Sequence, residues 1–234
     1  MLPIANRQAP EYARPMIRAI ERGDRALIQI VDAAFASSAR RSGEWLVCHP
    51  GCTQCCFGSF AINQLDAHRL RRGLAALQSA NPDRGARVLA RAGDAVRRLS
   101  PDFPGDPVTG ILDPSEAGQK KFAAFANHEP CPVLDPQTGL CDLYDARPMT
   151  CRTFGPPVRT EGGLAVCELC YRERSNQEIA ACEMIPDPDD LESQLLNRLE
   201  QASGTCGETI VAFALAPPAR PAKQTARRKP RRSA

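Results

Sequence analysis

Hydrophobic side chains recur at helical spacing through much of this chain. Residues 13–40 place most of their large apolar side chains on one face of a helix. The pair Gly23-Asp24 interrupts this pattern, so one long helix and two short ones both satisfy it. We therefore predict an N-terminal helical segment over residues 1–44.

Two further helices are predicted on either side of a short turn. Residues 63–77 and 84–99 each repeat apolar positions at steps of three and four residues, as an amphipathic helix requires. An Asn-Pro-Asp signal at residues 81–83 marks the turn between them. Residues 100–114 hold four prolines and two glycines and are predicted to be a loop, and residues 115–127 are predicted to form another helix.

The second half of the chain has a different texture. Between residues 129 and 170, proline, glycine and cysteine alternate with short apolar fragments, which is typical of a chain wrapped around ligands. Residues 187–203 return to a helical pattern, and residues 209–215 are apolar and fit a strand or a helix equally well. Aromatic residues at 5%, with 21 prolines and 16 glycines, disfavour large barrels and sandwiches. The predicted fold class is mainly α with a small β contribution, a single domain whose irregular cysteine-rich centre is organised by metal.

The chain is expected to be soluble and cytoplasmic. No run approaches the roughly 18 to 20 apolar residues that cross a bilayer, and residues 1–12 lack the basic-then-apolar layout of a secretory signal. Its 234 residues, 43% of them hydrophobic, suffice for one or two cores without disulfide bonds. Because cytosolic thiols are kept reduced, the eleven cysteines indicate metal or redox chemistry.

Positive charge is concentrated at one end of the chain. The formal net charge is +3, yet residues 217–234 carry seven basic side chains and no acidic one, which leaves 23 basic against 27 acidic residues elsewhere. With nothing large to bury, residues 216–234 are predicted to be a disordered basic tail. Such a tail can bind nucleic-acid phosphates, but no aromatic side chain is interleaved with its basic residues, so we favour a solubilising role. The sequence points to no particular protein partner.

Four cysteines fall within nine residues. They are Cys48, Cys52, Cys55 and Cys56, in the pattern C-x3-C-x2-C-C. If Pro50 opens a helix, the last three share one face, and in a tight knuckle the sulfurs converge as well. Crowded thiolates repel one another, and a divalent ion at about 2.3 Å from each sulfur reverses that penalty. The group therefore predicts a metal ion.

Five more cysteines form two later groups. Cys131, Cys141 and Cys151 are separated by equal gaps, and turn-forming residues between the first two let them face each other across a hairpin-like loop. Cys167 and Cys170 form a C-x2-C knuckle that can grip one ion from two sides. We expect this knuckle to supply the ligands that the earlier groups lack.

Other residues near these groups are predicted to play supporting roles. Cys182 and Cys206 stand alone and are interpreted as structural thiols. His68 and the arginines beside it are predicted to lie on the surface of a helix. Arg147 and Arg152 are expected to donate hydrogen bonds or charge to anionic thiolate centres.

Two signatures in order resemble the YkgJ-type cysteine-cluster family, also described as a zinc- or iron-chelating CxxCxxCC domain, to which flagellin lysine N-methylases are related. The first ends at Cys56, and the second is Cys131-Pro followed by C-x2-Y-x2-R-P-x2-C-R-x-F. The resemblance spans roughly residues 45–170. It implies a cysteine-cluster metal-binding domain, which we predict over residues 45–215 with a helical insertion at residues 63–127. The metal ligands that it implies are Cys48, Cys52, Cys55, Cys56, Cys131, Cys141 and Cys151.

Ligand counting leaves the number of centres open. A closed zinc site and a simple iron–sulfur cluster each take four cysteines, and thiolate-rich sites suit both, so the cofactor is predicted to be zinc or an iron–sulfur cluster. The resemblance implies seven ligands and Cys167 or Cys170 completes eight, so two centres are our hypothesis and one cluster with outer thiols is the alternative. Cys48-x3-Cys52-x2-Cys55 also matches the radical S-adenosylmethionine spacing. The alternative function is therefore an iron–sulfur, S-adenosylmethionine-dependent oxidoreductase or protein lysine methylase-like enzyme, and no catalytic residue is indicated.

Overall fold

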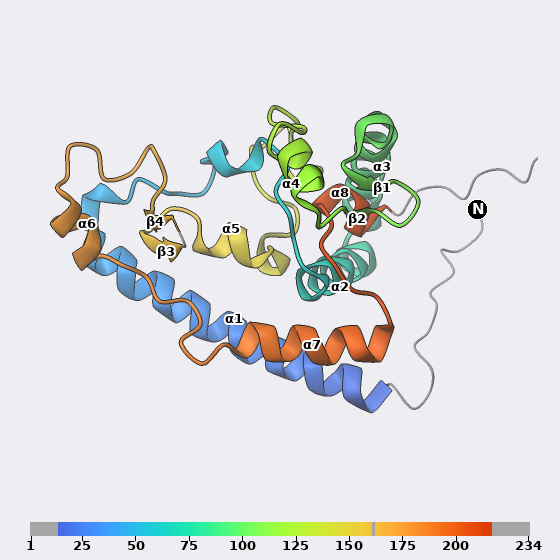
Figure 1. Ribbon diagram of the computed structural model, residues 1–234, viewed down its shortest axis with the longest axis horizontal. Helices are drawn as coiled ribbons and strands as arrows, with labels where there is room; N and C mark the ends of the chain where they lie inside the picture. Colours follow the sequence, from blue (N-terminus) through green and yellow to red (C-terminus); the bar gives the residue numbers. More distant parts are fainter. Residues whose placement is uncertain (1–13, 161, 217–234) are drawn as a thin grey trace, which may run out of the picture.

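The computed structural model describes residues 14–160 and 162–216 (Figure 1). Its helices are α1 (Arg14–Ser42), α2 (Gln64–Ala80), α3 (Pro82–Leu99), α4 (Glu116–Ala123), α5 (Met149–Thr153), α6 (Asn176–Ala181), α7 (Leu191–Ser203) and α8 (Val211–Leu215). Two antiparallel ribbons pair β1 (Gly105–Asp106) with β2 (Ile111–Leu112) and β3 (Val158–Thr160) with β4 (Gly163–Ala165). Short 3-10 helices are η2 (Gly43–Trp45), η3 (Gln54–Cys56), η4 (Ser100–Asp102) and η5 (Tyr144–Ala146). The mainly α fold class with small β content is confirmed.

Helix α1 runs without a break through the pair that the sequence left open. Gly23 lies where α7 crosses it, and a Cβ there would come within 2.5 Å of the Leu195 side chain. Asp24 is buried and pairs with Arg69 of α2. Both residues therefore serve contacts between helices, which is why one long helix is formed rather than two short ones.

Helices α2 and α3 begin and end close to the predicted boundaries. The side chain of Asn63 accepts a hydrogen bond from the Asp66 amide and caps α2. Asn81 ends α2 and caps α3, accepting from the Arg84 amide, while Pro82 occupies the first turn where no intrahelical donor is needed. The turn signal in the sequence is thus a cap shared by two antiparallel helices.

The apolar run at residues 209–215, which fitted a strand or a helix, contains helix α8. All of its residues are buried, and it packs against α2 and α3. The chain reaches it through an antiparallel bridge between Ile62 and Thr209. Complete burial explains why the run shows neither a helical nor a strand periodicity, since no face of α8 needs to be polar.

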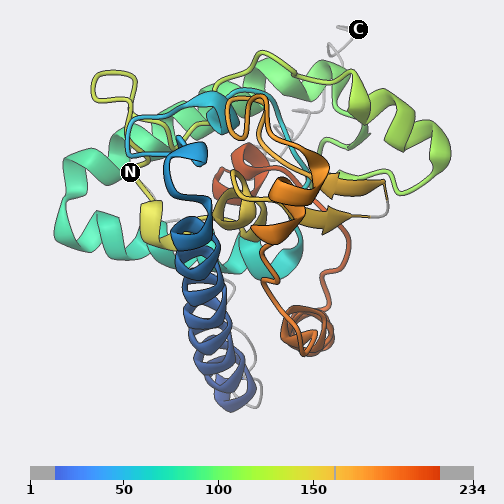
Figure 2. The same ribbon diagram turned by 90° about the vertical axis from the view of Figure 1, so that its left-hand side faces the viewer.

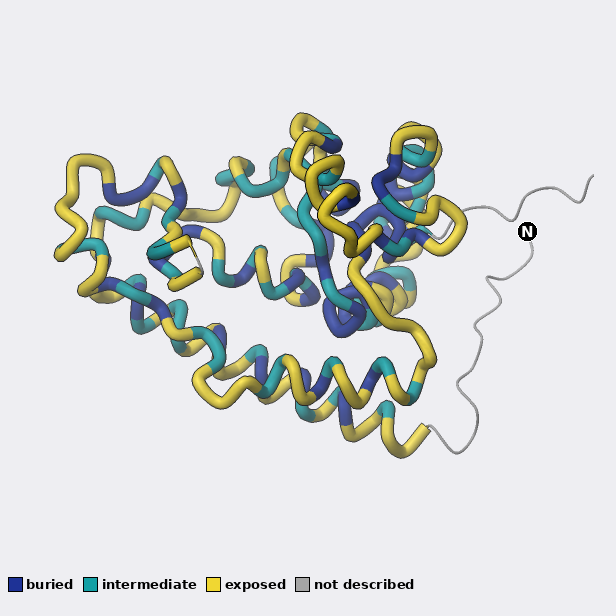
Figure 3. The backbone as a smooth tube through the Cα atoms, in the orientation of Figure 1, coloured by how far each residue is buried: buried dark blue, intermediate teal, exposed yellow. Residues whose placement is uncertain are grey.

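The helices form two packed groups that meet where α2 contacts α7. One group joins α2, α3 and α8, and the other joins α1 with α7, so buried residues collect in both places (Figure 3). Figure 2 shows α1 as a long rod that extends away from the body of the molecule. From the C-terminal end of α1, segment 46–57 runs back above α1 toward the centre of the molecule (Figure 1). Segment 166–171 ends beside the start of this stretch, where the Tyr171 amide donates to the Trp45 carbonyl at 2.9 Å.

A glycine in α2 sets how closely the cysteine-bearing loop approaches. A Cβ at Gly73 would lie 2.3 Å from the Cβ of Ala146 in η5, well inside contact distance. We expect Gly73→Ala to cost about 1–3 kcal/mol of unfolding free energy, because the loop must move or the side chain must overlap it. Denaturant unfolding measures this.

The matched control for that prediction is Gly93→Ala in α3. The only neighbour within 4 Å there is the end of the Arg97 side chain at 3.9 Å. This substitution should raise stability by about 0.5–1 kcal/mol through helix propensity alone. Equal effects of the two substitutions would contradict close packing at Gly73.

Two sequence expectations concern the basic tail and the absence of a membrane-spanning helix. Residues 217–234, which make up nearly all of the predicted basic tail, lie outside the described residues. In the part of the chain that the structure describes, no helix combines the length and apolar character needed to span a bilayer.

Candidate metal centre

The first cysteine group lies in an irregular segment rather than on a helical face. Gly51 has φ +91°, so the α-helix expected from Pro50 onward does not form. The Cys52 amide instead donates to the His49 carbonyl at 3.0 Å. The chain then makes the short helix η3, which carries Cys55 and Cys56. The prediction of a common helical face is therefore wrong, and the alternative of a tight knuckle describes the segment.

The second group sits on the predicted hairpin-like loop. Leu134 and Cys141 form an antiparallel bridge, and the Asp142 amide donates to the Val133 carbonyl at 2.8 Å. Asp135 closes the turn by accepting from the Gln137 amide at 3.1 Å. The loop thus brings Cys141 back beside the start of the segment, as expected from its turn residues.

Backbone amides near the thiols of this loop oppose the effect of burial. Hydrogen bonding from the amides of Val133 and Leu134 lowers the pKa of Cys131, and hydrogen bonding from the amide of Leu143 lowers the pKa of Cys141. Hydrogen bonds of this kind favour the thiolate form, and such bonds to sulfur also tune metal centres.

Three separate parts of the chain bring four thiols together. The Cys131 amide donates to the Cys56 carbonyl at 2.7 Å, which fixes the second group against the first. Cys151 enters from α5. Burial raises the pKa of Cys131 to about 12, and the neighbouring thiols of Cys141 and Cys55 raise it as well. Burial also raises the pKa of Cys151, followed by the effects of Cys131, Cys55 and Cys141. Cys55, Cys131, Cys141 and Cys151 therefore form one neighbourhood, called here the inner thiol group.

A second neighbourhood gathers around the C-x2-C knuckle. Burial raises the pKa of Cys170 to about 11, and the thiols of Cys167 and Cys48 add to the effect. Burial raises the pKa of Cys48 too, followed by the effects of Cys52, Cys55 and Cys167. Cys48, Cys52, Cys167 and Cys170 are called here the outer thiol group.

Close backbone approach holds the outer thiol group together. The Cys170 amide donates to the Cys167 carbonyl at 2.9 Å, and hydrogen bonding from the Val47 backbone lowers the pKa of Cys170. Gly155 has φ +120°, and a Cβ there would lie 3.5 Å from the Cys48 sulfur. The C-x2-C knuckle and Cys48 therefore approach each other at Gly155, which has no side chain to keep them apart.

Cys56, also expected to be a ligand, lies against the inner thiol group through its neighbour Cys55. A hydrogen bond between the Cys55 and Cys56 thiols, together with burial, raises the pKa of Cys55. Cys182 is buried beside Cys167 and Cys170, which agrees with a structural thiol, whereas Cys206 is exposed. His49 is exposed and its ring contacts the Pro50 carbonyl.

The thiols are neighbours but do not yet form a closed coordination shell. All eleven cysteines are free, with no disulfide among them. Within residues 14–160 and 162–216, no three His, Cys, Asp or Glu side chains converge as one metal-binding group. The donor chemistry nevertheless fits a soft metal, because both groups consist of four thiols from facing segments, several of them receiving backbone hydrogen bonds.

A single guanidinium serves both thiol groups. Arg147 lies over the Tyr144 ring at 3.6 Å, and its Nε donates to the Tyr144 carbonyl at 2.9 Å. Its charge lowers the pKa of four thiols, and in each of them the opposing effect of burial is larger; the four are Cys48, Cys55, Cys141 and Cys151. Arg147 therefore supplies the charge that the sequence analysis expected at an anionic centre.

Arg152 has a different set of partners. Its side chain is buried, donates to Asp32 of α1 at 2.8 Å, and also binds the carbonyls of Asp145 and Arg147. It thus ties the backbone at Arg147 to α1. The two arginines that the sequence treated alike are divided between the thiols and the scaffold.

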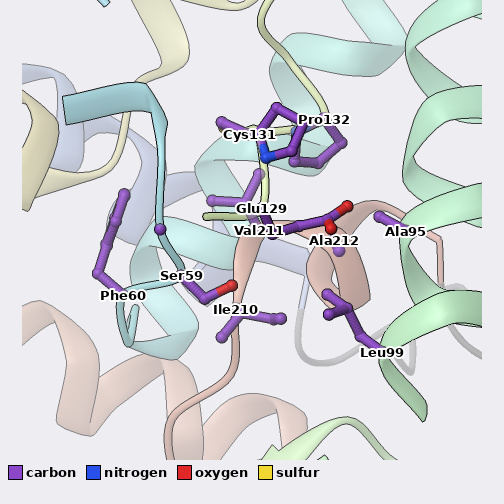
Figure 4. A pocket seen from close by; sticks show the side chains of 12 residues that line it. Ser59, Phe60, Ala95, Leu99, Glu129, Cys131, Pro132, Ile210, Val211 and Ala212 are labelled. Atoms are coloured by element: carbon purple, nitrogen blue, oxygen red, sulfur yellow. The ribbon is translucent and has the colours of Figure 1, made fainter. Parts of the chain in front are cut away.

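Helix α3 anchors the inner thiol group from behind. Asp142, next to Cys141, is paired with both Arg84 and Arg91, and Arg91 Nε donates to the Pro132 carbonyl at 2.9 Å. A pocket of only about 20 Å³ remains between this backbone, α3 and α8, room for about one water molecule (Figure 4). The loop therefore rests on a well-filled support.

A buried ion network, missed by the sequence analysis, supports the same region. Arg69 is only 4% exposed and lies between Asp24 and Asp66, which corrects its assignment to a helix surface. Asp66 also accepts from the Met149 amide at 2.9 Å, and Arg69 donates to the Arg147 carbonyl at 3.3 Å. The sequence contains a signal for this network, because Asp24 and Asp66 fall on the apolar faces of their predicted helices.

His68 is partly buried rather than fully on the surface. Its ring contacts Glu21 at 3.2 Å. Burial lowers the pKa of His68, and the neighbouring Glu21 opposes that effect. It lies on α2, away from the thiol groups, and serves the contact with α1.

The cysteine-rich part of the chain matches a known protein family. The model of one family, CxxCxxCC, described as "Putative zinc- or iron-chelating domain", matches residues 47–171. The chain belongs to the CxxCxxCC family. Chelation of zinc or iron is thus the function that the family description gives, and the matched range holds the nine cysteines of both thiol groups and Cys56. No curated protein and no solved structure matches the chain.

Proposed function

We propose that this CxxCxxCC protein binds two metal centres, one in each thiol group. The inner thiol group supplies Cys55, Cys131, Cys141 and Cys151, and the outer thiol group supplies Cys48, Cys52, Cys167 and Cys170. The observation that carries the proposal is the approach of cysteine segments that are distant in the chain. The Cys131 amide donates to the Cys56 carbonyl at 2.7 Å, Cys55 and Cys151 line one pocket, and the Cys167 amide donates at 3.4 Å to the carbonyl of Gly155, which lies beside the Cys48 sulfur. The effects of these thiols on one another's pKa agree with this arrangement, and Cys55 also raises the pKa of Cys48, so the two groups adjoin. Four thiolates are what a closed zinc site or a simple iron–sulfur cluster takes.

Binding requires the thiols to release protons and turn toward a common point. Burial raises the pKa of Cys131 to about 12 and that of Cys170 to about 11, so these two thiols stay protonated at neutral pH without metal, and coordination displaces their protons. A bound ion supplies the positive charge that makes four neighbouring thiolates stable. Arg147 and the backbone amides of Val133, Leu143 and Val47 offset part of the remaining negative charge.

The alternative of a radical S-adenosylmethionine enzyme gains no support from the fold. In the described residues, the strands form only two antiparallel two-stranded ribbons. The parallel strand-and-helix repeat of a barrel is therefore missing from this part of the chain. Cys48, Cys52 and Cys55, which gave the motif spacing, are divided between the two thiol groups in our proposal.

Metal analysis of single variants tests the two-centre proposal. Anaerobically purified wild-type protein should contain about two centres per chain, and Cys151→Ser and Cys167→Ser should each lower that number to about one. Cys206→Ser is the matched control, because Cys206 is exposed and lies in neither group, and it should retain both. Elemental analysis with an absorption spectrum gives the number and identity: visible absorption with iron indicates iron–sulfur, and a colourless protein with zinc indicates zinc sites.

Two outcomes would contradict the proposal. A ratio near one centre in the wild-type protein would remove the second centre. Loss of all metal from both Cys151→Ser and Cys167→Ser, with each variant still folded by circular dichroism, would mean that the thiols form a single cooperative site.

A further inference from the structure

A pocket of about 400 Å³ opens beside the inner thiol group. Cys55 and Cys151, from two different segments, form part of its wall. The remaining lining residues are Gln54, Phe57, Gly58, Ser59, Phe60, Asn127, Thr150 and Phe154. Its volume lies within the usual range for small-molecule sites.

The walls of the pocket are aromatic and uncharged. Phe57 and Phe154 are 53% and 40% exposed, and both line it. Phe60 adds a third ring. Among the described residues that line the pocket, the polar ones are amides and hydroxyls, and none is charged. Large aromatic side chains held at the surface around one hollow are typical of a surface that a partner or ligand covers.

One wall is held rigidly by the backbone. The amide of Gly58 donates to the Glu129 carbonyl at 3.0 Å, and the amide of Ser59 donates to the Ala126 carbonyl at 3.2 Å. Gly58 has φ +90° and Ala126 has φ +54°, a left-handed conformation that is unfavourable for an alanine. Such outliers cluster at functional sites, where surrounding structure enforces them.

We propose that this pocket binds an uncharged aromatic molecule that carries hydrogen-bonding groups. The ring packs against Phe57 and Phe154, and its polar edge meets the amide and hydroxyl groups of the wall. When Cys55 and Cys151 are bound to metal as thiolates, they disfavour an anion in this pocket. Their charge is met by the metal and by Arg147, and among the described residues that line the pocket no carboxylate is present to pair with an organic cation. The proposal for this pocket rests on the proposed function in one respect. The ligand would lie beside the metal that Cys55 and Cys151 are proposed to bind.

Three small probes of similar size test the charge preference. They are p-cresol, benzylamine and p-toluate, which are neutral, cationic and anionic at neutral pH. Saturation-transfer NMR on the metal-containing protein should show saturable binding of p-cresol and at least tenfold weaker binding of the two charged probes. Equal binding of all three, or no binding of p-cresol, would overturn the proposal.

Variants place the binding in this pocket. Phe154→Ala should weaken p-cresol binding at least tenfold, because it removes one aromatic wall. Val108→Ala, which truncates a 64% exposed side chain outside the lining, is the matched control and should leave binding unchanged. Thr150→Val keeps the shape and removes a hydroxyl, and should weaken binding about threefold to tenfold. Unchanged p-cresol affinity in both Phe154→Ala and Thr150→Val would contradict this site.

Metal content measured on the same samples separates the two proposals. If metal is bound at two centres and p-cresol is not, the pocket proposal fails and the metal proposal stands. If p-cresol binds with the expected dependence on Phe154 and metal is absent, the pocket stands and the metal proposal fails.

Discussion

Removal of the bound metal is expected to unfold the cysteine-rich centre while α2, α3 and α7 keep their helical structure. Segments 46–57 and 131–155 contain only short helices and isolated bridges, so regular backbone hydrogen bonding fixes them less firmly than it fixes the long helices. A structural metal contributes on the order of 10 kcal/mol, which is comparable with the whole stability of a typical domain. Hydrogen exchange before and after chelation should show lost protection at Leu134 and Asp142.

Helical regions provide the internal control for that experiment. The contact of α1 with α7 and the packing of α8 on α2 and α3 involve apolar cores that need no metal. Their amides should remain protected after chelation, and circular dichroism should keep most of its helical signal. Unchanged protection at residues 131–155 in fully metal-free protein would contradict a metal-organised centre.

Substitution of Asp24 by alanine is expected to cost about 3–5 kcal/mol of unfolding free energy, the second largest effect. Arg69 is buried between Asp24 and Asp66, and loss of one carboxylate leaves its charge poorly compensated away from water. Because Arg69 also donates to the Arg147 carbonyl, the damage extends toward the inner thiol group. Chemical denaturation measures the cost.

Two controls separate burial from charge pairing. Glu116→Ala removes a carboxylate that pairs with Lys120 on the surface of α4, and should change stability by no more than about 1 kcal/mol. The triple variant Asp24→Leu, Asp66→Asn and Arg69→Met removes all three charges, keeps an acceptor for the Met149 amide, and should recover much of the loss. A loss from Asp24→Ala as small as that from Glu116→Ala would show that Arg69 is not held by this pair.

The sequence predicted the helices whose signals are local. The antiparallel pair α2 and α3 follows from apolar periodicity and from Asn81-Pro82, because a cap and a proline act within one turn. Gly23 and Asp24 carry the same kind of signal, yet α1 continues through them. Their partners, Leu195 and Arg69, are distant in the chain, and no local pattern identifies them.

The candidate site was predicted in composition but not in arrangement. Spacing alone indicated which cysteines are candidate ligands, since clustered thiols have few other uses in a reduced compartment. It could not show that Cys48 lies with Cys167 and Cys170. That division depends on the close approach of Gly155 and on the turn at Gly51, both of which are set by tertiary contacts.

The position of α8 bears on how the molecule is made. Helices α2 and α3 leave the ribosome roughly a hundred residues before α8, which covers their shared apolar surface. During that interval the hairpin of α2 and α3 exposes its apolar surface to solvent. The cysteines of the first group are already made, but those of the later groups are not. A nascent chain of this protein is therefore expected to depend on chaperones, and to bind its metal only near the end of translation.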